Sequence, residues 1–161
     1  MTGDWRWSAA VRSFTTDGFF ALAPEDRGDV DRPVTVDFTS ALGRAHRGRG
    51  WLGLQHYEED RGNGTELQTN DTRITTLEGG WSGTRWQVRG HHQDQRFRSR
   101  FSRILSGRTG EVLTARQDIP ATSTGVSATW TAPGGWLAGA DGRRVVWEQG
   151  SGDLDQNLLG A

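Results

Sequence analysis

The alternation of apolar and polar residues constrains this chain most, because a period of two fits a β-strand and not an α-helix. In the stretch VTVDFTSAL, residues 34–42, polar residues separate Val34, Val36 and Phe38. Gly, Asn, Asp and Pro interrupt the alternation about every ten residues, a spacing typical of antiparallel sheets. Helical periodicity is nearly absent. The chain is therefore predicted to be an antiparallel all-β protein.

The pattern divides into roughly nine strands joined by short, hairpin-like links, whereas parallel neighbours would need long crossovers. Two architectures fit this layout: an up-and-down β-barrel of calycin type and a two-sheet β-sandwich. The short sequential links favour the barrel. Residues 1–150 are expected to form a single domain, with residues 151–161 as a C-terminal tail.

Aromatic residues are expected to do much of the core packing, because the chain holds eight Trp and six Phe but only three Ile and one Met. Several Trp stand beside Gly at expected strand starts, in GWLG (50–53), GWSG (80–83) and GGWLAG (134–139). Such Trp can plug a barrel end, line an apolar ligand site or offer a platform to a sugar. The expected ligand-binding wall consists of Trp5, Trp7, Trp51, Trp81, Trp86, Phe97, Phe101, Trp130 and Trp147.

The longest alternating stretch, residues 81–105, changes parity along its length. Trp86 and Val88 occupy even positions, but Phe97 and Phe101 occupy odd ones. A regular strand cannot keep both pairs on one face. A β-bulge at Gly90, where the backbone is least restricted, is predicted to bring them to the same side.

After such a bulge, His91, Gln93 and Gln95 would point inward together. Buried polar groups cost free energy unless they are paired or wet, so these three side chains would line a ligand-filled or hydrated cavity. Alternatively, the stretch is two strands with a corner near Gly90, and the three side chains form a solvated rim. Adjacent His91 and His92 point to opposite faces of a strand, so they do not bind one metal together.

The stretch QHYEED, residues 55–60, offers a further candidate. Tyr57 points inward if Trp51 does, and could then donate a hydrogen bond to a ligand. If Leu52 and Leu54 point inward, His56 and Glu58 take its place. The sequence leaves this choice open. The candidate catalytic residues are His91, Tyr57, Gln93 and Gln95.

The opening GDW, Gly3 to Trp5, resembles the G-x-W start of lipocalins. With its serial hairpins and a late arginine, Arg143 or Arg144, the chain is similar in layout to the calycin family of small β-barrels. The resemblance implies a closed barrel with Trp5 packed across its floor. Because the chain has no cysteine, it points to the cytoplasmic barrels of this architecture, which include cofactor-free cyclases and haem-binding nitrobindin-like proteins.

The favoured function is the binding of a largely apolar small molecule inside a Trp- and Phe-lined barrel. Cofactor-independent cyclisation or isomerisation in bacterial secondary metabolism would suit such a site, because holding a substrate in a reactive geometry can itself lower a barrier. The alternative is a carbohydrate-binding module, or a structural or assembly protein, that uses exposed Trp faces without catalysis. Neither reading requires a cofactor or a metal.

The remaining expectations concern partners and location. Arg96, Arg98 and Arg100 form a ladder that a solvated strand face also produces, and no stacking aromatics accompany it, so no nucleic-acid partner is expected. No apolar run reaches the ~20 residues of a spanning helix. We therefore expect no membrane partner and a cytoplasmic location, and a homodimer is compatible with the sequence.

Overall fold

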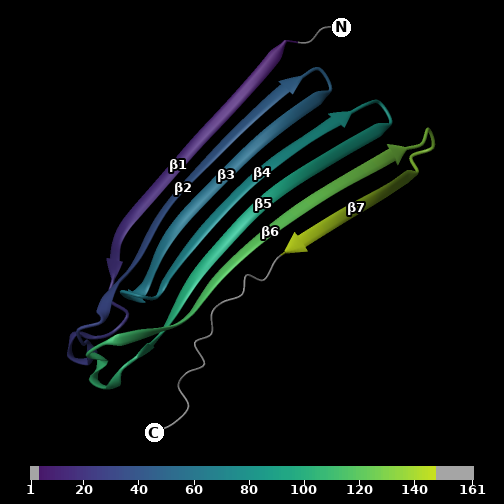
Figure 1. Ribbon diagram of the computed structural model, residues 1–161. Helices are drawn as coiled ribbons and strands as arrows, with labels where there is room; N and C mark the ends of the chain where they lie inside the picture. The colour runs from purple at the N-terminus through teal and green to yellow at the C-terminus, as the bar shows by residue number, and fades with distance from the viewer. Residues whose placement is uncertain (1–3, 148–161) are drawn as a thin grey trace.

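The computed structural model describes residues 4–147, which form one antiparallel sheet whose strands follow each other in chain order (Figure 1). The strands are β1 (Trp5–Phe19), β2 (Asp31–Arg47), β3 (Gly50–Thr65), β4 (Thr69–Ser82), β5 (Trp86–Ile104), β6 (Glu111–Thr131) and β7 (Leu137–Trp147). Two single-turn 3-10 helices lie in the connections, η1 (Pro24–Asp26) and η2 (Ser106–Arg108). The all-β, antiparallel, up-and-down prediction is confirmed.

The number of strands differs from the sequence-based prediction. The described residues contain seven strands rather than nine. Alternation on both sides of Pro120 predicts two of the nine strands, residues 111–119 and 125–132, but the structure has one strand there, because β6 runs through Pro120. Residues 19–23 form no strand of their own, because β1 ends at Phe19. Gly3 of the lipocalin-like start and the expected tail 151–161 lie outside the described residues.

The described sheet is open, so the barrel is not confirmed. Each of β1 and β7 pairs with a neighbour on one side only, and the two strands lie at opposite edges in Figure 1. Since consecutive strands alternate in direction, β1 and β7 run the same way. We call the end that holds the start of β1 and the β2–β3 turn the upper end. The lower end holds the β1–β2, β3–β4 and β5–β6 connections.

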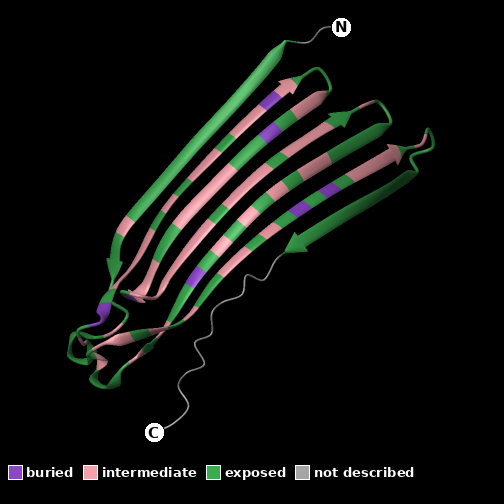
Figure 2. Ribbon diagram, in the orientation of Figure 1, coloured by how far each residue is buried: buried purple, intermediate pink, exposed green. Residues whose placement is uncertain are grey.

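The sheet is a single layer with almost no core. Val30 and Ala45 are the buried apolar residues of the described chain, and no large side chain within it is fully buried. Figure 2 shows both edge strands largely exposed and the central strands half-buried. Long ladders of backbone hydrogen bonds therefore hold the strands together. A sheet normally buries at least one face against another layer, and the described residues supply no such layer to either face. No described helix has the length and apolarity needed to cross a membrane.

At the lower end, the β5–β6 connection contacts the β1–β2 connection and the first residue of β2. The β5–β6 connection meets the start of β2, where Arg108 Nε donates to Asp31 Oδ2 at 2.7 Å and Arg108 Nη2 donates to Asp31 Oδ1. The Gly28 N–H donates to the same carboxylate at 2.8 Å. A Cβ on Gly28 would lie 2.5 Å from the Arg108 carbonyl oxygen, so glycine permits the close approach. These donors, Arg108 first, lower the pKa of Asp31 to about 2.

The predicted β-bulge at Gly90 is wrong. Gly90 pairs with Gly79 on one side and Val126 on the other, and the register is continuous on both sides of it. The register of β5 shifts only between Phe101 and Ser102. Trp86 and Val88 therefore lie on the opposite face of β5 from Phe97 and Phe101. The large apolar residues of β5 therefore change from one face of the sheet to the other along the strand.

Candidate functional site

The strand register divides the side chains between two faces. We call the face that carries Trp7, Ala45 and Leu52, which are directly opposite one another, the Trp7 face. The reverse side carries Arg44 and Glu78 and is called the Arg44 face. The Trp7 face is apolar in its upper half and charged in its lower half. The Arg44 face is polar in its upper half and partly apolar in its lower half.

The upper half of the Trp7 face is apolar across all seven strands, and we call it the apolar belt. Apart from Trp130, which is less exposed, its large side chains are between 38% (Val88) and 75% (Val11) exposed. Small residues such as Gly43 and Gly79 fill the remaining positions. The large members are Trp5, Trp7, Val11, Leu52, Leu54, Leu77, Trp81, Trp86, Val88, Val126 and Trp130. With strands ~4.8 Å apart, the belt covers on the order of 600 Å², more than a soluble surface usually exposes.

The belt runs obliquely across the strands. Its lower border lies at Val11 on β1, at Leu77 on β4 and at Val126 on β6, which is a displacement of two register rows. Two rows correspond to ~13 Å along the strands, and the five strand spacings from β1 to β6 to ~24 Å across them, so the belt is tilted by about 28°. If the Thr and His side chains at its lower border are included, the zone without Asp, Glu or Arg side chains, which we call the uncharged zone, is about 20 Å tall on β2 to β5.

Tryptophans mark the upper border of the belt. Trp5 stacks on Trp7 with ring centroids 5.3 Å apart, and Trp86 lies 6.4 Å from Trp130. The one charged residue in the belt, Arg47, also lies at this border, where its guanidinium is 5.4 Å from the Trp5 ring centroid. Aromatic rings beside an arginine therefore separate the belt from the upper end of the sheet.

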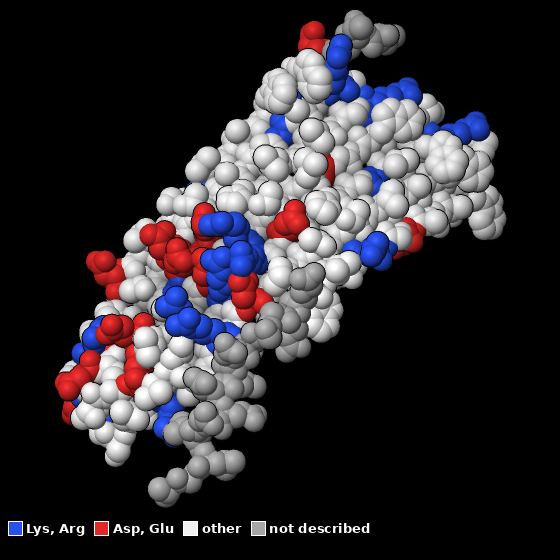
Figure 3. Space-filling view, viewed as in Figure 1, with Lys and Arg blue, Asp and Glu red and all other residues white. Residues whose placement is uncertain are grey.

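The lower half of the Trp7 face is charged. Figure 3 shows acidic and basic side chains gathered over the lower part of the face in view, whereas the upper part is mostly uncharged. Arg96 pairs with Asp118 across β5 and β6, and Arg73 pairs with Glu58 across β4 and β3. Hydrogen bonds from these arginines lower the pKa of Glu58 and of Asp118. This ordered ion-pair lattice suits contact with water.

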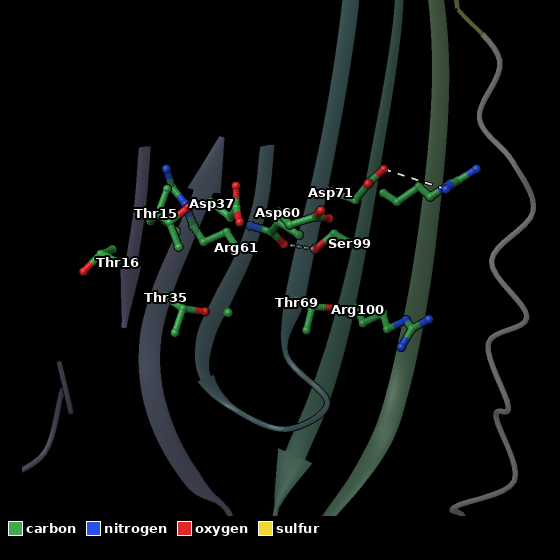
Figure 4. A pocket seen from close by; sticks show the side chains of 14 residues that line it. Thr15, Thr16, Thr35, Asp37, Asp60, Arg61, Thr69, Asp71, Ser99 and Arg100 are labelled. Atoms are coloured by element: carbon green, nitrogen blue, oxygen red, sulfur yellow. Dashed lines mark hydrogen bonds and ion pairs between the residues drawn. The ribbon is translucent and has the colours of Figure 1, made fainter. Parts of the chain in front are cut away.

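An open depression of ≈630 Å³ lies among these charges, between β1 and β5 (Figure 4). Asp60 and Asp71 are directly opposite in register there. Desolvation and the neighbouring Asp71 raise the pKa of Asp60. Arg98 lies 3.8 Å from Asp71 and moderates the local negative charge.

The Arg44 face shows the reverse arrangement. Its upper half is polar: Arg44 Nη2 donates to Glu78 Oε1 at 2.7 Å, and the Arg44 guanidinium lies 4.5 Å from the Trp51 ring centroid. Gln55 donates to the same carboxylate at 3.4 Å. Level with the apolar belt, one side of the sheet is therefore apolar and the other carries charged and amide groups.

The lower half of the Arg44 face is partly apolar. Phe14 stacks on Phe38 at 5.6 Å, and Phe38 lies 5.9 Å from Tyr57. The Tyr57 hydroxyl donates to Glu59 at 2.6 Å, and this hydrogen bond raises the pKa of the phenol. Ile74 and Phe97 lie on the same face on the next two strands.

The four candidate catalytic residues lie on one face. His91, Gln93 and Gln95 are all on the Arg44 face, because residues two apart in a regular strand share a face. Gln93 donates to Gln95 at 3.4 Å. Tyr57 is on that face too, in the same register row as Gln95 with Ile74 between them. Of the two facings left open for residues 51–60, Tyr57 therefore accompanies Trp51, whereas Leu52, Leu54, His56 and Glu58 lie on the Trp7 face.

The expected ligand-binding wall is split between the two faces. Trp5, Trp7, Trp81, Trp86 and Trp130 lie on the Trp7 face, whereas Trp51, Phe97, Phe101 and Trp147 lie on the Arg44 face. They do not converge on one interior. Within residues 4–147, no group of three or more His, Asp or Glu side chains is arranged to hold a metal ion.

The arrangement defines an open antiparallel sheet that is apolar on one side and polar on the other over its upper half. Comparison with known proteins gave no matching family model, no similar curated protein and no similar solved structure.

Proposed function

We propose that this sheet is part of the wall of a membrane-embedded barrel, with the apolar belt against lipid hydrocarbon and the upper Arg44 face against water. The observation that carries the proposal is the opposite polarity of the two faces at one level of the sheet. Membrane β-barrels alternate apolar outward and polar inward residues in this way, around an apolar band about 25 Å tall. The uncharged zone, about 20 Å tall, is close to that height.

Three further features support lipid as the partner of the apolar belt. Trp is enriched where hydrocarbon meets water, and Trp5, Trp81 and Trp86 lie at the upper border. Arginine near such a border can extend its charged end to the headgroups, which suits Arg47. The oblique course of the belt is what a strand tilted against the membrane normal requires.

A second sheet packed on the Trp7 face, as in a β-sandwich, is less compatible with the charges. Such a layer would also cover the lower half, where Glu58, Arg73 and Arg96 would lose water. Removing ion pairs from water carries a desolvation penalty that their attraction often fails to offset. Lipid contacts only the belt and leaves these pairs hydrated.

The open edges constrain how such a wall closes. Unpaired strand edges are not tolerated in hydrocarbon, so β1 and β7 need partners. Direct pairing of β7 with β1 would be parallel, so antiparallel closure takes an odd number of additional strands. Antiparallel pairing of an edge strand with the same strand of a second copy, through a two-fold axis normal to the sheet, would place the two belts at opposite ends, which a single bilayer cannot cover.

The enclosed ligand site expected from the sequence remains an untested prediction, as do the cyclase or isomerase activity and the calycin relationship. The split of the Trp and Phe wall gives them no support. Exposed Trp also suits the carbohydrate-binding or assembly alternative. The proposed membrane contact replaces the expectation of a cytoplasmic chain without a membrane partner, which rested on the lack of an apolar helix.

Lipid quenching tests the proposal with a matched pair of tryptophans. Trp81 and Trp51 lie at the same level, on the Trp7 face and the Arg44 face respectively. We expect the chain, refolded into phosphatidylcholine vesicles, to float with them and to be quenched by acyl-chain-brominated lipid. Trp81→Phe should remove more of that quenching than Trp51→Phe. A chain that stays monodisperse in water and does not float with vesicles would overturn the proposal.

A further inference from the structure

The upper half of the Arg44 face is richer in arginine than in carboxylate. The three uppermost register rows that span all seven strands contain four arginines and two acidic residues on this face. The arginines are Arg6, Arg44, Arg89 and Arg143, and the acidic residues are Glu78 and Asp141. We infer that this surface attracts small anionic solutes, such as inorganic anions and compounds with carboxylate or phosphate groups. The inference rests on the proposed function, because it takes this face to border water inside a barrel.

The internal pairing leaves most of the positive charge available. Glu78 accepts hydrogen bonds from Arg44 at 2.7 Å and from Gln55 at 3.4 Å, so its charge is already matched. Among the described ion pairs, none joins Arg6, Arg89 or Arg143 to a carboxylate. Arg143 donates instead to the neutral Ser123 hydroxyl at 3.0 Å.

The positions of these arginines suit a solute moving along the face. Arg6 lies in the same register row as Trp51 and Arg89, and Arg44 and Arg143 share the next row. Arg6 and His46 also line an open depression of ≈260 Å³. Guanidinium groups recognise carboxylates and phosphates through paired N–H donors. Low-dielectric walls concentrate the field of such charges and raise the local concentration of oppositely charged solutes.

Trp51 is a reporter at the centre of this surface, since the Arg44 guanidinium lies over its ring. We would measure quenching of the vesicle-inserted chain by iodide, caesium and neutral acrylamide, and assign the Trp51 share by subtracting the Trp51→Phe variant. After normalisation to acrylamide, iodide should quench Trp51 at least about two-fold better than caesium, and added salt should reduce the difference.

Two variants test the electrostatic origin. Arg89→Glu should lower the iodide-to-caesium ratio, whereas Glu78→Gln should raise it. Ser127→Glu, whose position pairs with Arg89 on the same face, should lower the ratio as well without removing an arginine. Equal quenching by iodide and caesium, with acrylamide reaching Trp51 freely, would overturn this inference and leave the proposed function standing. Quenching of Trp51 by brominated lipid instead of acrylamide would overturn the proposed function itself.

Discussion

Leu77→Arg should destabilise the lipid-inserted chain by about 2 kcal/mol, because a charged residue on the lipid face of a membrane sheet costs ~2–4 kcal/mol near the midplane and less towards the borders. Leu77 is 47% exposed, lies directly opposite Leu54, and is near the middle of the uncharged zone, which on β4 runs from Trp81 to Thr75. In water, arginine at a half-exposed position would change stability little. The free energy of unfolding in vesicles, from reversible denaturant titration, measures the effect.

The neighbouring residue supplies the control. Thr76 points to the Arg44 face, between Gln55 and Gln93 in register. Thr76→Arg adds the same side chain one residue away but on the side facing water, and should shift the free energy of unfolding by no more than about 0.5 kcal/mol. Equal losses for the two variants, or a Leu77→Arg chain as stable as wild type, would show that the Trp7 face does not contact hydrocarbon.

Asp31→Asn should lower the denaturation midpoint at neutral pH, because it removes the charge that Arg108 pairs with at the lower end. The Asp31 side chain is 5% exposed, and its pKa is lowered to about 2 from an ordinary value near 3.8. A lowered pKa means that the ionised carboxylate stabilises the folded state. That stabilisation is fully present above pH 3.8 and is lost as the pH falls through about 2.

The difference between wild type and Asp31→Asn should therefore be largest at neutral pH and shrink between pH 4 and pH 2. Denaturant midpoints of both chains at pH 7, 4 and 2 measure it. Glu66→Gln is the control, since its pairing with Arg32 is exposed and such pairs contribute ~0–1 kcal/mol. A gap between wild type and Asp31→Asn that is unchanged at pH 2 would show that the Asp31 charge does not stabilise the lower end.

The strand class and its serial order are predictable from local pattern alone. Alternation such as Val34, Val36 and Phe38 identifies strands, and short Gly-containing links identify antiparallel neighbours. The facing of residues 51–60 is not predictable in this way, because both facings place plausible groups inward. The facing is fixed by the register in which β3 pairs with β2 and β4. That register depends on residues outside the stretch 51–60.

The prediction of a bulge at Gly90 was wrong because it assumed that a strand has one core-facing side along its whole length. The parity change recurs at a similar level in other strands: Trp5 and Trp7 against Phe14 in β1, and Leu52 and Leu54 against Tyr57 in β3. One bulge explains one strand. A repeated exchange indicates instead that the environment itself changes halfway along the sheet, and this signal was present in the sequence.

The central claim is that the sheet has lipid on one side and water on the other at the same level. A nitroxide scan along β3 tests it most directly, and the absence of cysteine from the chain makes every single-cysteine variant free of background labelling. Oxygen partitions into hydrocarbon and a water-soluble nickel chelate does not, so their collision rates with the label distinguish the two environments.

In vesicles, we predict a period of two between Leu52 and Gln55. Labels at Leu52 and Leu54 should favour oxygen, whereas labels at Gly53 and Gln55 should favour the nickel chelate. The oxygen preference should disappear at Glu58, in the charged lower half of the same face. Labels at Leu52 and Leu54 that collide with neither reagent, or with the nickel chelate as often as their neighbours do, would contradict the account.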